Sequence, residues 1–253
     1  MELRELCARY DERLRTEAFA EIDASANGLQ IGSDGTVGHA AFAVDAAVET
    51  IDRAAEAGAD VLCTHHGLVW GGLDRVTGRD FERVAALIEN DLALYVSHLP
   101  LDSHPELGNA AGVAAHLGLD SPEPFGSLGP ETIGLAGRLP SPLSPDDLST
   151  RLSELDTGGR DVRTLEFGPE EITEVAVVTG SGADWLGEAA DAGVDAFVTG
   201  EGKQQLYHEA REAGLTVALA GHYATETFGV RSLQELADEW GLETTWIDAP
   251  TGL

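Results

Sequence analysis

Two segments of this 253-residue chain combine histidine and acidic residues at spacings that favour metal binding. His65 and His66 follow an apolar run and precede Gly67, so a predicted strand can end there, bend, and let both rings converge. His222 and Glu226 are four residues apart in a segment with helical periodicity, which places them one turn apart on the same face. The chemistry that these pairs predict is chelation of a metal ion.

Each pair also has a plainer interpretation. The tandem histidines could be hydrogen-bonded residues at a buried strand end, where polar ring nitrogens need partners. Glu226 could be an acid that interacts with the helix dipole beside a surface histidine. The other acidic and histidine residues near predicted strand ends favour the metal site over these readings.

Asp102 and Glu201 also follow predicted strands. Asp102 comes after a proline-set turn, where it could bridge two metal ions or bind one. Glu201 is our candidate catalytic residue, a general base for a metal-activated water; it could instead orient another ligand or be structural. Three histidines are weaker candidates, as groups that touch the ligands or the substrate or as structural residues: His98, His104 and His208.

The five stronger metal candidates form a mixed nitrogen and oxygen donor set: His65, His66, Asp102, His222 and Glu226. Such a set suits Zn, Fe, Mn, Co or Ni ions better than Ca²⁺ or Mg²⁺, which prefer oxygen alone. Five ligands are too many for one tetrahedral zinc with an open position. They fit two divalent or trivalent ions about 3.5 to 4 Å apart, the arrangement used for hydrolysis of phosphate, amide or ring C–N bonds.

The candidate residues are positioned by alternating predicted helices and strands. Predicted strands cover 39–44, 60–64, 92–97, 162–167, 174–179, 196–199, 216–220 and 244–248, with a further edge strand at 133–139. Predicted helices cover 2–22, 46–57, 79–90, 106–117, 146–155, 183–192, 203–213 and 222–240. This order predicts an α/β fold with much parallel pairing, whose ligands bind beyond the carboxyl ends of the strands. One such end, 179–182, could also receive an anionic group.

The chain contains an internal repeat. Segments 54–67 and 189–202 are identical at seven of fourteen positions, although an Ala-Gly-Asp sequence is common where a helix leads into a strand. A second match follows, because His98 and Asp102 share the spacing of His222 and Glu226. We therefore expect two similar, intertwined α/β lobes, 1–120 with the tandem histidines and 146–253 with the His-x-x-x-Glu helix, joined by a Pro/Gly-rich connection at 121–145.

The charge balance is strongly acidic, with 45 Asp and Glu against 15 Lys and Arg, and Lys203 is the only lysine. The net charge of -30 favours a halophilic protein that works in a salt-loaded cytoplasm, and it makes a nucleic-acid partner unlikely because phosphate binding needs clustered cations. No apolar run is long enough to cross a membrane, and no signal peptide is recognisable. Two distant cysteines predict no disulfide scaffold, which also favours the cytoplasm.

These motifs together resemble those of the NIF-three-like dinuclear metal-centre proteins, some of which are called GTP cyclohydrolase 1 type 2 homologs. The resemblance extends over nearly the whole chain, and the segments that carry it are 27–30, 64–67, 98–109, 199–201 and 221–226. It implies that His65, His66, Asp102, His222 and Glu226 bind the metals. It also implies two intertwined lobes and a homohexameric ring, a trimer of dimers, with the sites facing its interior.

The expected function is metal-dependent hydrolysis of a nucleotide or a related small molecule, similar to a type 2 GTP cyclohydrolase and using metal-activated water. The alternative is a metal-binding or regulatory hexamer without catalysis. The substrate, the native metal and the bridging ligand stay open at this level.

Overall fold

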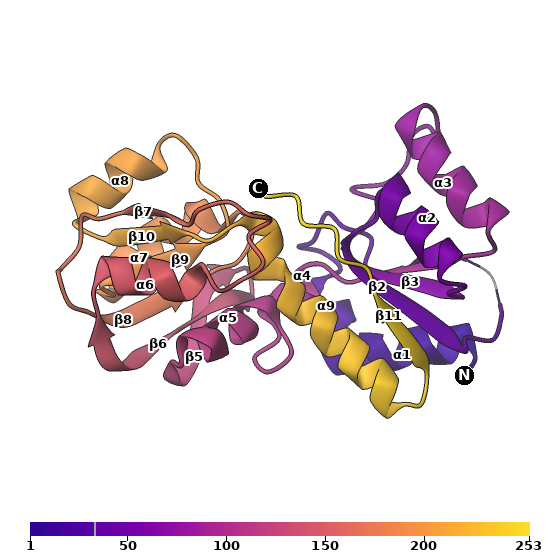
Figure 1. Cartoon of the computed structure of the whole chain (residues 1–253), viewed down its shortest axis with the longest axis horizontal. Helices are drawn as coiled ribbons and strands as arrows, with labels where there is room; N and C mark the ends of the chain where they lie inside the picture. The colour runs from indigo at the N-terminus through magenta and orange to yellow at the C-terminus, as the bar shows by residue number, and fades with distance from the viewer. Residues whose placement is uncertain (33) are drawn as a thin grey trace. The chain divides into compact units, whose positions relative to one another are not determined.

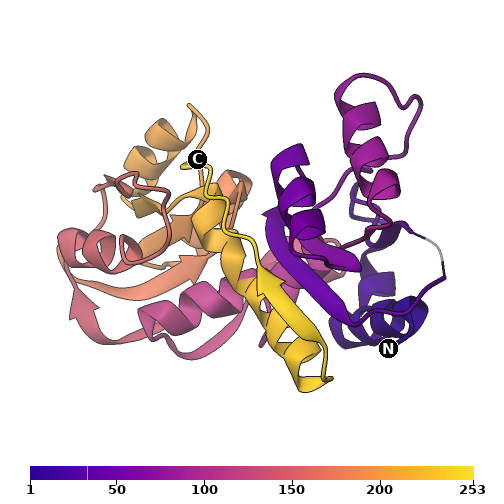
Figure 2. The ribbon, with the colours of Figure 1, turned by 45° about the vertical axis from the view of Figure 1, so that its right-hand side comes forward.

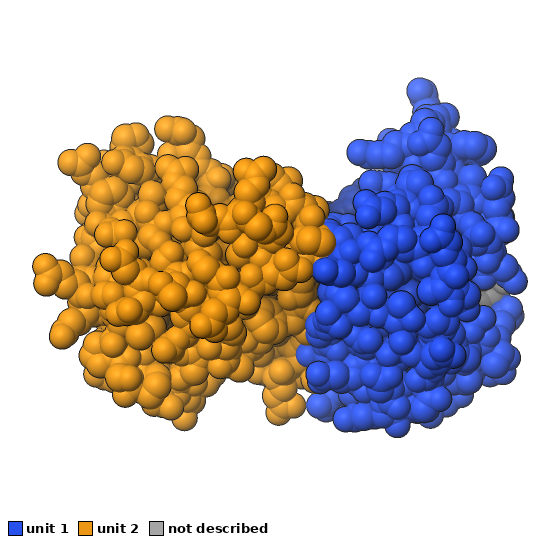
Figure 3. Space-filling model, in the orientation of Figure 1, with its two compact units in different colours: residues 1–101, 229–249 blue, residues 102–228, 250–253 orange. Residues whose placement is uncertain are grey.

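The computed structural model describes residues 1–32 and 34–253, which form two compact units (Figure 1). Unit 1 comprises residues 1–101 and 229–249, and unit 2 comprises residues 102–228 and 250–253 (Figure 3). The chain therefore leaves unit 1 and returns to it, as expected of intertwined lobes. Each unit has its own sheet and its own core, so each is described separately.

Unit 1 is built on a five-stranded sheet with the order β1-β4-β3-β2-β11. These strands are β1 (Gly28–Ile31), β2 (His39–Asp45), β3 (Val61–His66), β4 (Ala93–Val96) and β11 (Glu243–Trp246). Neighbouring strands from β4 to β11 are parallel, whereas β1 lies antiparallel to β4 at the edge. The carboxyl ends of β2, β3 and β4 therefore meet at one edge of the sheet.

Helices cover both faces of this sheet, which explains why its central strands are apolar on both sides. The helices are α1 (Leu3–Leu14), the short 3-10 helix η1 (Thr16–Phe19), α2 (Val48–Glu56), α3 (Arg79–Glu89) and α9 (His222–Glu239), whose residues from 229 onward belong to unit 1. On the face of α2 and α3, Ile51 and Leu87 pack with Leu62. On the opposite face lie α1 and α9 (Figures 1 and 2). On this face the Tyr10 ring contacts Tyr95 and Trp240.

Unit 2 is built on a six-stranded sheet with the order β5-β6-β8-β9-β10-β7. These strands are β5 (Asp120–Leu128), β6 (Glu131–Leu143), β7 (Arg163–Leu165), β8 (Ile172–Val177), β9 (Ala196–Thr199) and β10 (Thr216–Leu219). The strands β8, β9 and β10 are parallel, and the remaining neighbours are antiparallel. Unit 2 thus repeats the three central parallel strands of unit 1.

The helices of unit 2 are α4 (Leu99–Ser103, which begins in unit 1), α5 (Asn109–Leu117), α6 (Pro145–Leu152), η2 (Gly182–Trp185), α7 (Leu186–Ala192), α8 (Leu206–Ala213) and the start of α9. The core joins one face of the sheet to α5 and α6, where Val113 and Leu148 pack against Val175 and Val198. Helices α7 and α8 pack against each other and against β9 and β7. Burial on both faces again holds the central strand ends in place.

Equivalent residues of the two repeats form equivalent hydrogen bonds. The Asp60 carboxylate accepts the backbone N–H groups of Gly38 and His39 at the start of β2. The Asp195 carboxylate accepts the backbone N–H groups of Thr173 and Glu174 at the start of β8. Gly58 and Gly193, which precede these acids, have φ values of 73° and 71°, which glycine adopts without strain. The predicted duplication is therefore confirmed by matching structure as well as by sequence.

The predicted connection 121–145 lies within unit 2 and contains most of β5 and β6. The expectation that 133–139 is an edge strand is wrong, because β6 pairs with both β5 and β8. The edge strand on this side of the sheet is β5, which our sequence analysis did not predict. It contains Pro122 and Pro124. Proline has no backbone N–H to donate, and it is tolerated in an edge strand because such a strand has no second neighbour to accept that hydrogen bond.

The first predicted helix, 2–22, is also divided. It ends at Leu14 because Arg15 adopts a left-handed conformation with a φ of 55°. Of the helices in residues 1–32 and 34–253, none is both long and apolar enough to cross a bilayer. Cys7 and Cys63 are both buried free thiols.

Candidate metal centre

Unit 1 brings three histidines together at the carboxyl ends of β3 and β4. His65 and His66 end β3, and His98 follows β4 by two residues. One ring nitrogen from each of the three lies within 4.8 Å of the others. His65 and His66 are the last two residues of β3, and close packing requires the glycine that follows, because a Cβ at Gly67 would lie 2.6 Å from the Val96 side chain. His98, a weaker candidate from sequence, belongs to this group.

Each of these three imidazoles donates a hydrogen bond from Nδ1 to an oxygen. The acceptors are the Ser97 carbonyl for His65 at 2.9 Å, Asp45 Oδ1 for His66 at 2.8 Å, and Asp23 Oδ1 for His98 at 2.9 Å. An oxygen at Nδ1 fixes the tautomer in which Nε2 carries the lone pair. The three rings therefore offer Nε2 as the ligand atom, and carboxylates or a carbonyl hold their orientation.

Asp23 is the most constrained of these acceptors. Its side chain is 1% exposed, and it also accepts hydrogen bonds from the Asn27 amide and from the backbone N–H of Leu99. Burial alone would raise the pKa of Asp23, but the hydrogen bond and charge of His98, together with Asn27, lower it below its usual value. Asp23 is therefore an ionised carboxylate that fixes both the ring and the backbone beside His98.

Asp23 and Asp45 are the site residues that sequence reasoning missed. Asp45 could have been predicted, because it ends the strand β2 and lies directly beside His66 in the parallel pairing of β2 with β3. Asp23 had none, because it lies outside the repeats, in the loop after η1. Asn27 belongs to the segment 27–30, which could line the site or form a turn, and its side-chain oxygen accepts the backbone N–H of His98 at 2.7 Å.

In unit 2, Asp102 lies in α4 and its side chain is buried. Its Oδ1 accepts hydrogen bonds from Asn109 at 2.7 Å and from the Thr179 hydroxyl at 3.3 Å. Asn109 begins α5 and Thr179 follows β8, so two elements of unit 2 fix this carboxylate. A buried carboxylate held in this way can act as a metal ligand.

His222 lies between two carboxylates at the start of α9. Its Nε2 is 3.1 Å from Glu226 Oε2, and its Nδ1 is 3.2 Å from Glu201 Oε1. Glu201 also accepts a hydrogen bond from the Ser181 hydroxyl. The i, i+4 geometry predicted for His222 and Glu226 is thus present, and Glu201 follows β9 and reaches the other side of the same ring.

These contacts have a clear electrostatic consequence. Burial opposes the charged form of His222, but the hydrogen bonds and charges of Glu226 and Glu201 outweigh it and raise the pKa of His222 to about 9. The pKa of Glu201 is lowered chiefly by the Ser181 hydroxyl and, against burial, by His222. A metal ion and a proton therefore compete for His222, and Glu201 is ionised at neutral pH.

Gly180 leaves room for the Glu226 carboxylate. Its φ is 58°, and a Cβ there would collide with that carboxylate and lie 3.1 Å from His222 Nε2. The neighbouring backbone is already used in hydrogen bonding: the N–H of Gly180 donates to the Thr225 hydroxyl and that of Gly182 to the Thr199 hydroxyl. These two amides are therefore engaged within the protein, contrary to the expectation that the 179–182 turn receives an anion through its amides.

The remaining two histidine candidates lie elsewhere. His104 Nδ1 accepts the backbone N–H groups of Glu106 and Leu107, so it organises the turn before α5. His208 is exposed on α8, with its ring against Tyr207. Within residues 1–32 and 34–253, neither belongs to the groups of side chains whose ligand atoms could share a metal ion.

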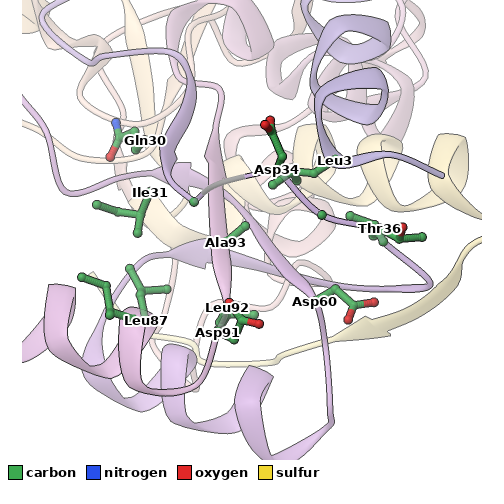
Figure 4. Close-up of a pocket in the computed structure, with 14 residues that line it drawn as sticks. Leu3, Gln30, Ile31, Asp34, Thr36, Asp60, Leu87, Asp91, Leu92 and Ala93 are labelled. Carbon is green, nitrogen blue, oxygen red and sulfur yellow. The ribbon is translucent and has the colours of Figure 1, made fainter.

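The candidate site is distinct from a cavity of about 540 Å³ in unit 1 (Figure 4). That cavity is lined by apolar and acidic residues of β1, α3 and β4, including Ile31, Leu87, Asp91 and Ala93, and by no histidine. Because no histidine lines this cavity, the residues that could bind a metal ion are the histidines and carboxylates described above. In unit 1, one ring nitrogen from each of His65, His66 and His98 lies close enough to the others to share a metal ion, and nitrogen donors favour a transition metal over Ca²⁺ or Mg²⁺.

The chain was compared with known families and structures. The model of the Duf34/NIF3 (NGG1p interacting factor 3) family matches residues 1–251. A protein of Halobacterium salinarum named "GTP cyclohydrolase 1 type 2 homolog" is 59% identical, with all of both chains covered. Two solved structures cover all of this chain and are themselves fully covered: protein ybgI, 38% identical with a TM-score of 0.91, and a Thermus thermophilus protein, TTHA1606, 36% identical with a TM-score of 0.89. The chain therefore belongs to the Duf34/NIF3 family.

Proposed function

We propose that this protein is a metal-dependent hydrolase that acts on a nucleotide or a related small molecule. Two divalent or trivalent transition-metal ions would be held by His65, His66, Asp102, His222 and Glu226. When bound, such ions lower the pKa of a water molecule and stabilise negative charge on the group under attack. The observation that carries the proposal is His222 between Glu226 and Glu201, at 3.1 and 3.2 Å.

The protein's own residues would transfer the proton and hold the histidine rings in place. Glu201 is our candidate general base: its lowered pKa keeps it ionised, so it can accept a proton, and the Ser181 hydroxyl holds its orientation. Asp45 and Asp23 are positioning residues, because each holds a histidine ring through Nδ1. The burial of His65 and Glu226 would exclude bulk water around the ligands and strengthen the local electrostatics.

The substrate class is proposed from the relatives. Curated relatives at 36 to 59% identity carry the name "GTP cyclohydrolase 1 type 2 homolog", which points toward a nucleotide. The excess of acidic residues disfavours a nucleic-acid chain as substrate or partner, because its many phosphates would be repelled by the net negative charge of the protein. A small molecule with one phosphorylated end avoids most of that repulsion.

We also propose a homohexamer, a ring built as a trimer of dimers, as the resemblance implies. Helix α3 offers apolar surface for such contacts, since Phe81 and Ile88 lie two turns apart on it and are 59% and 65% exposed. Sedimentation of the purified protein tests this. A mass near six chains is expected, and a monomer at working concentration contradicts it.

The catalytic proposal is tested by turnover of the metal-loaded protein on a panel of nucleotides. Glu226→Gln keeps the size of the side chain but removes a ligand charge, so we expect turnover to fall at least about 100-fold. The matched control is Glu235→Gln, an exposed position in the same helix, and it should keep full activity with the same unfolding midpoint. Turnover that survives both metal removal and Glu226→Gln contradicts hydrolysis at this site. No turnover on the whole panel, with assembly lost on metal removal, favours the regulatory alternative.

A further inference from the structure

A separate cavity of about 210 Å³ lies in unit 2 at the carboxyl ends of β9 and β10. Gly202, after β9, and Leu219, the last residue of β10, form part of its wall. Arg163, which pairs with Leu219 across the β10–β7 ladder, forms the other side. Ligands of α/β sheets bind at this end of the strands, so the position is that of a ligand site.

The charged residues that line this cavity are unusual for the chain. Both are basic, Arg163 and Lys203, although acidic residues outnumber basic ones three to one. Within the described residues, the Arg163 guanidinium forms no ion pair. Lys203 Nζ contacts both Asp184 oxygens at 2.6 Å, but both side chains are more than half exposed, so this pair is weak and can open for a ligand. Arg163 is therefore the main available cation.

Apart from Gln204, the rest of the lining is apolar and partly aromatic. Leu206 and Leu219 contribute aliphatic surface, and the half-exposed Tyr207 ring is braced edge-on by Phe167 at 5.3 Å. Gly202 keeps the space open, because a Cβ there would lie 2.8 Å from Leu206 and 3.2 Å from Leu219. A flat or aliphatic body with one anionic end matches this combination of surfaces.

We propose that this cavity binds the phosphate group of a phosphorylated small-molecule substrate, with Arg163 as its principal ligand and Lys203 as a second cation. The cavity is close to the candidate metal centre in the chain, because Gly202 follows Glu201 directly and Leu219 precedes His222 by three residues. The wall of the cavity is thus continuous in the chain with the segments that carry Glu201 and His222. The substrate class rests on the proposed function, whereas phosphate binding by Arg163 can be measured without any reaction.

The test is isothermal titration calorimetry on the full-length, metal-loaded protein at fixed KCl concentration. The probes are the four common ribonucleoside 5′-monophosphates and their uncharged nucleosides. At least one monophosphate should bind more tightly than its nucleoside, and Arg163→Gln should weaken it about tenfold, since a guanidinium makes charge-assisted, bidentate contacts to phosphate. Arg163→Lys should restore part of the loss. Arg211→Gln, an equal change of charge at an exposed position on α8 outside the cavity, should leave affinity unchanged.

The outcomes separate this proposal from the hydrolase proposal. Equal binding of every nucleoside and its monophosphate overturns the phosphate site, and so does equal affinity in the wild type and Arg163→Gln, which would mean that phosphate binds to the metal ions. Loss of turnover in Glu226→Gln with monophosphate affinity retained supports both proposals. Absence of turnover in the wild type, with the Arg163 effect on affinity intact, contradicts hydrolysis but supports the phosphate site.

Discussion

At the residue scale, the three histidines of unit 1 share one hydrogen-bonding arrangement. Each ring gives its Nδ1 hydrogen to an oxygen and keeps Nε2 for a ligand. In unit 2 the ring of His222 is instead flanked by two glutamates, and their charges raise its pKa to about 9. The three rings of unit 1 are prepared for a cation, because their orientation and tautomer are fixed before it binds, whereas His222 must first lose a proton.

Asp45→Asn tests this positioning. The amide can no longer accept the His66 hydrogen bond as strongly, so we expect metal affinity to fall about 10- to 100-fold while the fold is kept. Competition with a chelating dye measures it. Asp52→Asn, an exposed position on α2 in the same unit, is the matched control. Equal affinities in the two variants would contradict a positioning role for Asp45.

The sequence predicted the candidate metal ligands better than it predicted the residues that hydrogen-bond to them. Tandem histidines before a glycine, and a histidine four residues before a glutamate, are local patterns. Asp23 supports His98 from 75 residues away in the chain, a distance at which no periodicity indicates a partner. His98 was undervalued for the same reason, because its place beside His65 depends on the parallel pairing of β3 and β4.

At the element scale, the two repeats stabilise their strands in the same way. The acids that precede β3 and β9 accept hydrogen bonds from the first residues of the neighbouring strand, as helix N-caps do for helices. The aspartate of the Ala-Gly-Asp sequence thus helps to set the register between neighbouring parallel strands, because it fixes where each of them begins. The strand's far end, where the candidate ligands lie, is thereby fixed as well.

Asp195→Ala should therefore destabilise unit 2. Three donors, including the Thr173 hydroxyl, lose an ionised acceptor, so we expect a loss of about 2 kcal/mol in the free energy of unfolding. Asp191→Ala, exposed on α7, should change it by less than about 0.5 kcal/mol. Denaturant unfolding at pH 7 measures both, and equal stabilities would contradict the role of Asp195.

The same variant predicts a pH dependence. Burial opposes the ionised form of Asp195, but the hydrogen bonds from Glu174 and Thr173 outweigh it and lower its pKa in the folded state. Its contribution is then fully present above the unfolded pKa of about 3.9 and is lost as pH falls through the lower folded value. The difference between wild type and Asp195→Ala should stay constant from about pH 7 to pH 5 and shrink below about pH 4. A constant difference down to about pH 2 would contradict this assignment.

Most elements were predictable because strands and helices alternate with clear apolar periodicity. β9 was predicted at the residues it occupies, and β8 and β10 within two residues at each end. β5 escaped because its prolines and exposed residues lack a strand pattern, and only its pairing with β6 makes it a strand. The 121–145 segment looked like a connection for the same reason.

At the scale of the whole molecule, the dominant feature is a net charge of -30. Acidic residues are spread over the chain, so repulsion between them opposes the compact state wherever salt is low. Raising ionic strength from about 0.1 M to 1 M shortens the screening length from about 10 Å to 3 Å. Increasing KCl should therefore raise the unfolding midpoint by several degrees.

Thermal unfolding followed by circular dichroism from low to molar KCl tests this halophilic prediction. Sucrose, which stabilises by exclusion without screening charge, is the control and should produce a much smaller rise. An unfolding midpoint independent of KCl would contradict salt adaptation. It would leave the acidic surface without a physical account.

The proposed ligands come from both units, His65 and His66 from unit 1 and Asp102, His222 and Glu226 from unit 2. Duplication explains how one chain could supply two ligand sets, since histidine or acidic residues follow the central strands of each repeat. Local sequence patterns predict each set, and the repeat and the mixed donor set already led us to expect that both sets serve the same pair of ions, as the family resemblance also implies.

The number of metal ions per chain tests this central claim most directly. Elemental analysis of the purified protein should give two transition-metal ions per chain in the wild type, and fewer in both His66→Ala and His222→Ala, one change in each unit. His208→Ala, exposed on α8, should keep two. A wild type without bound metal, or a metal content that neither His66→Ala nor His222→Ala reduces, would contradict a metal centre built from these residues.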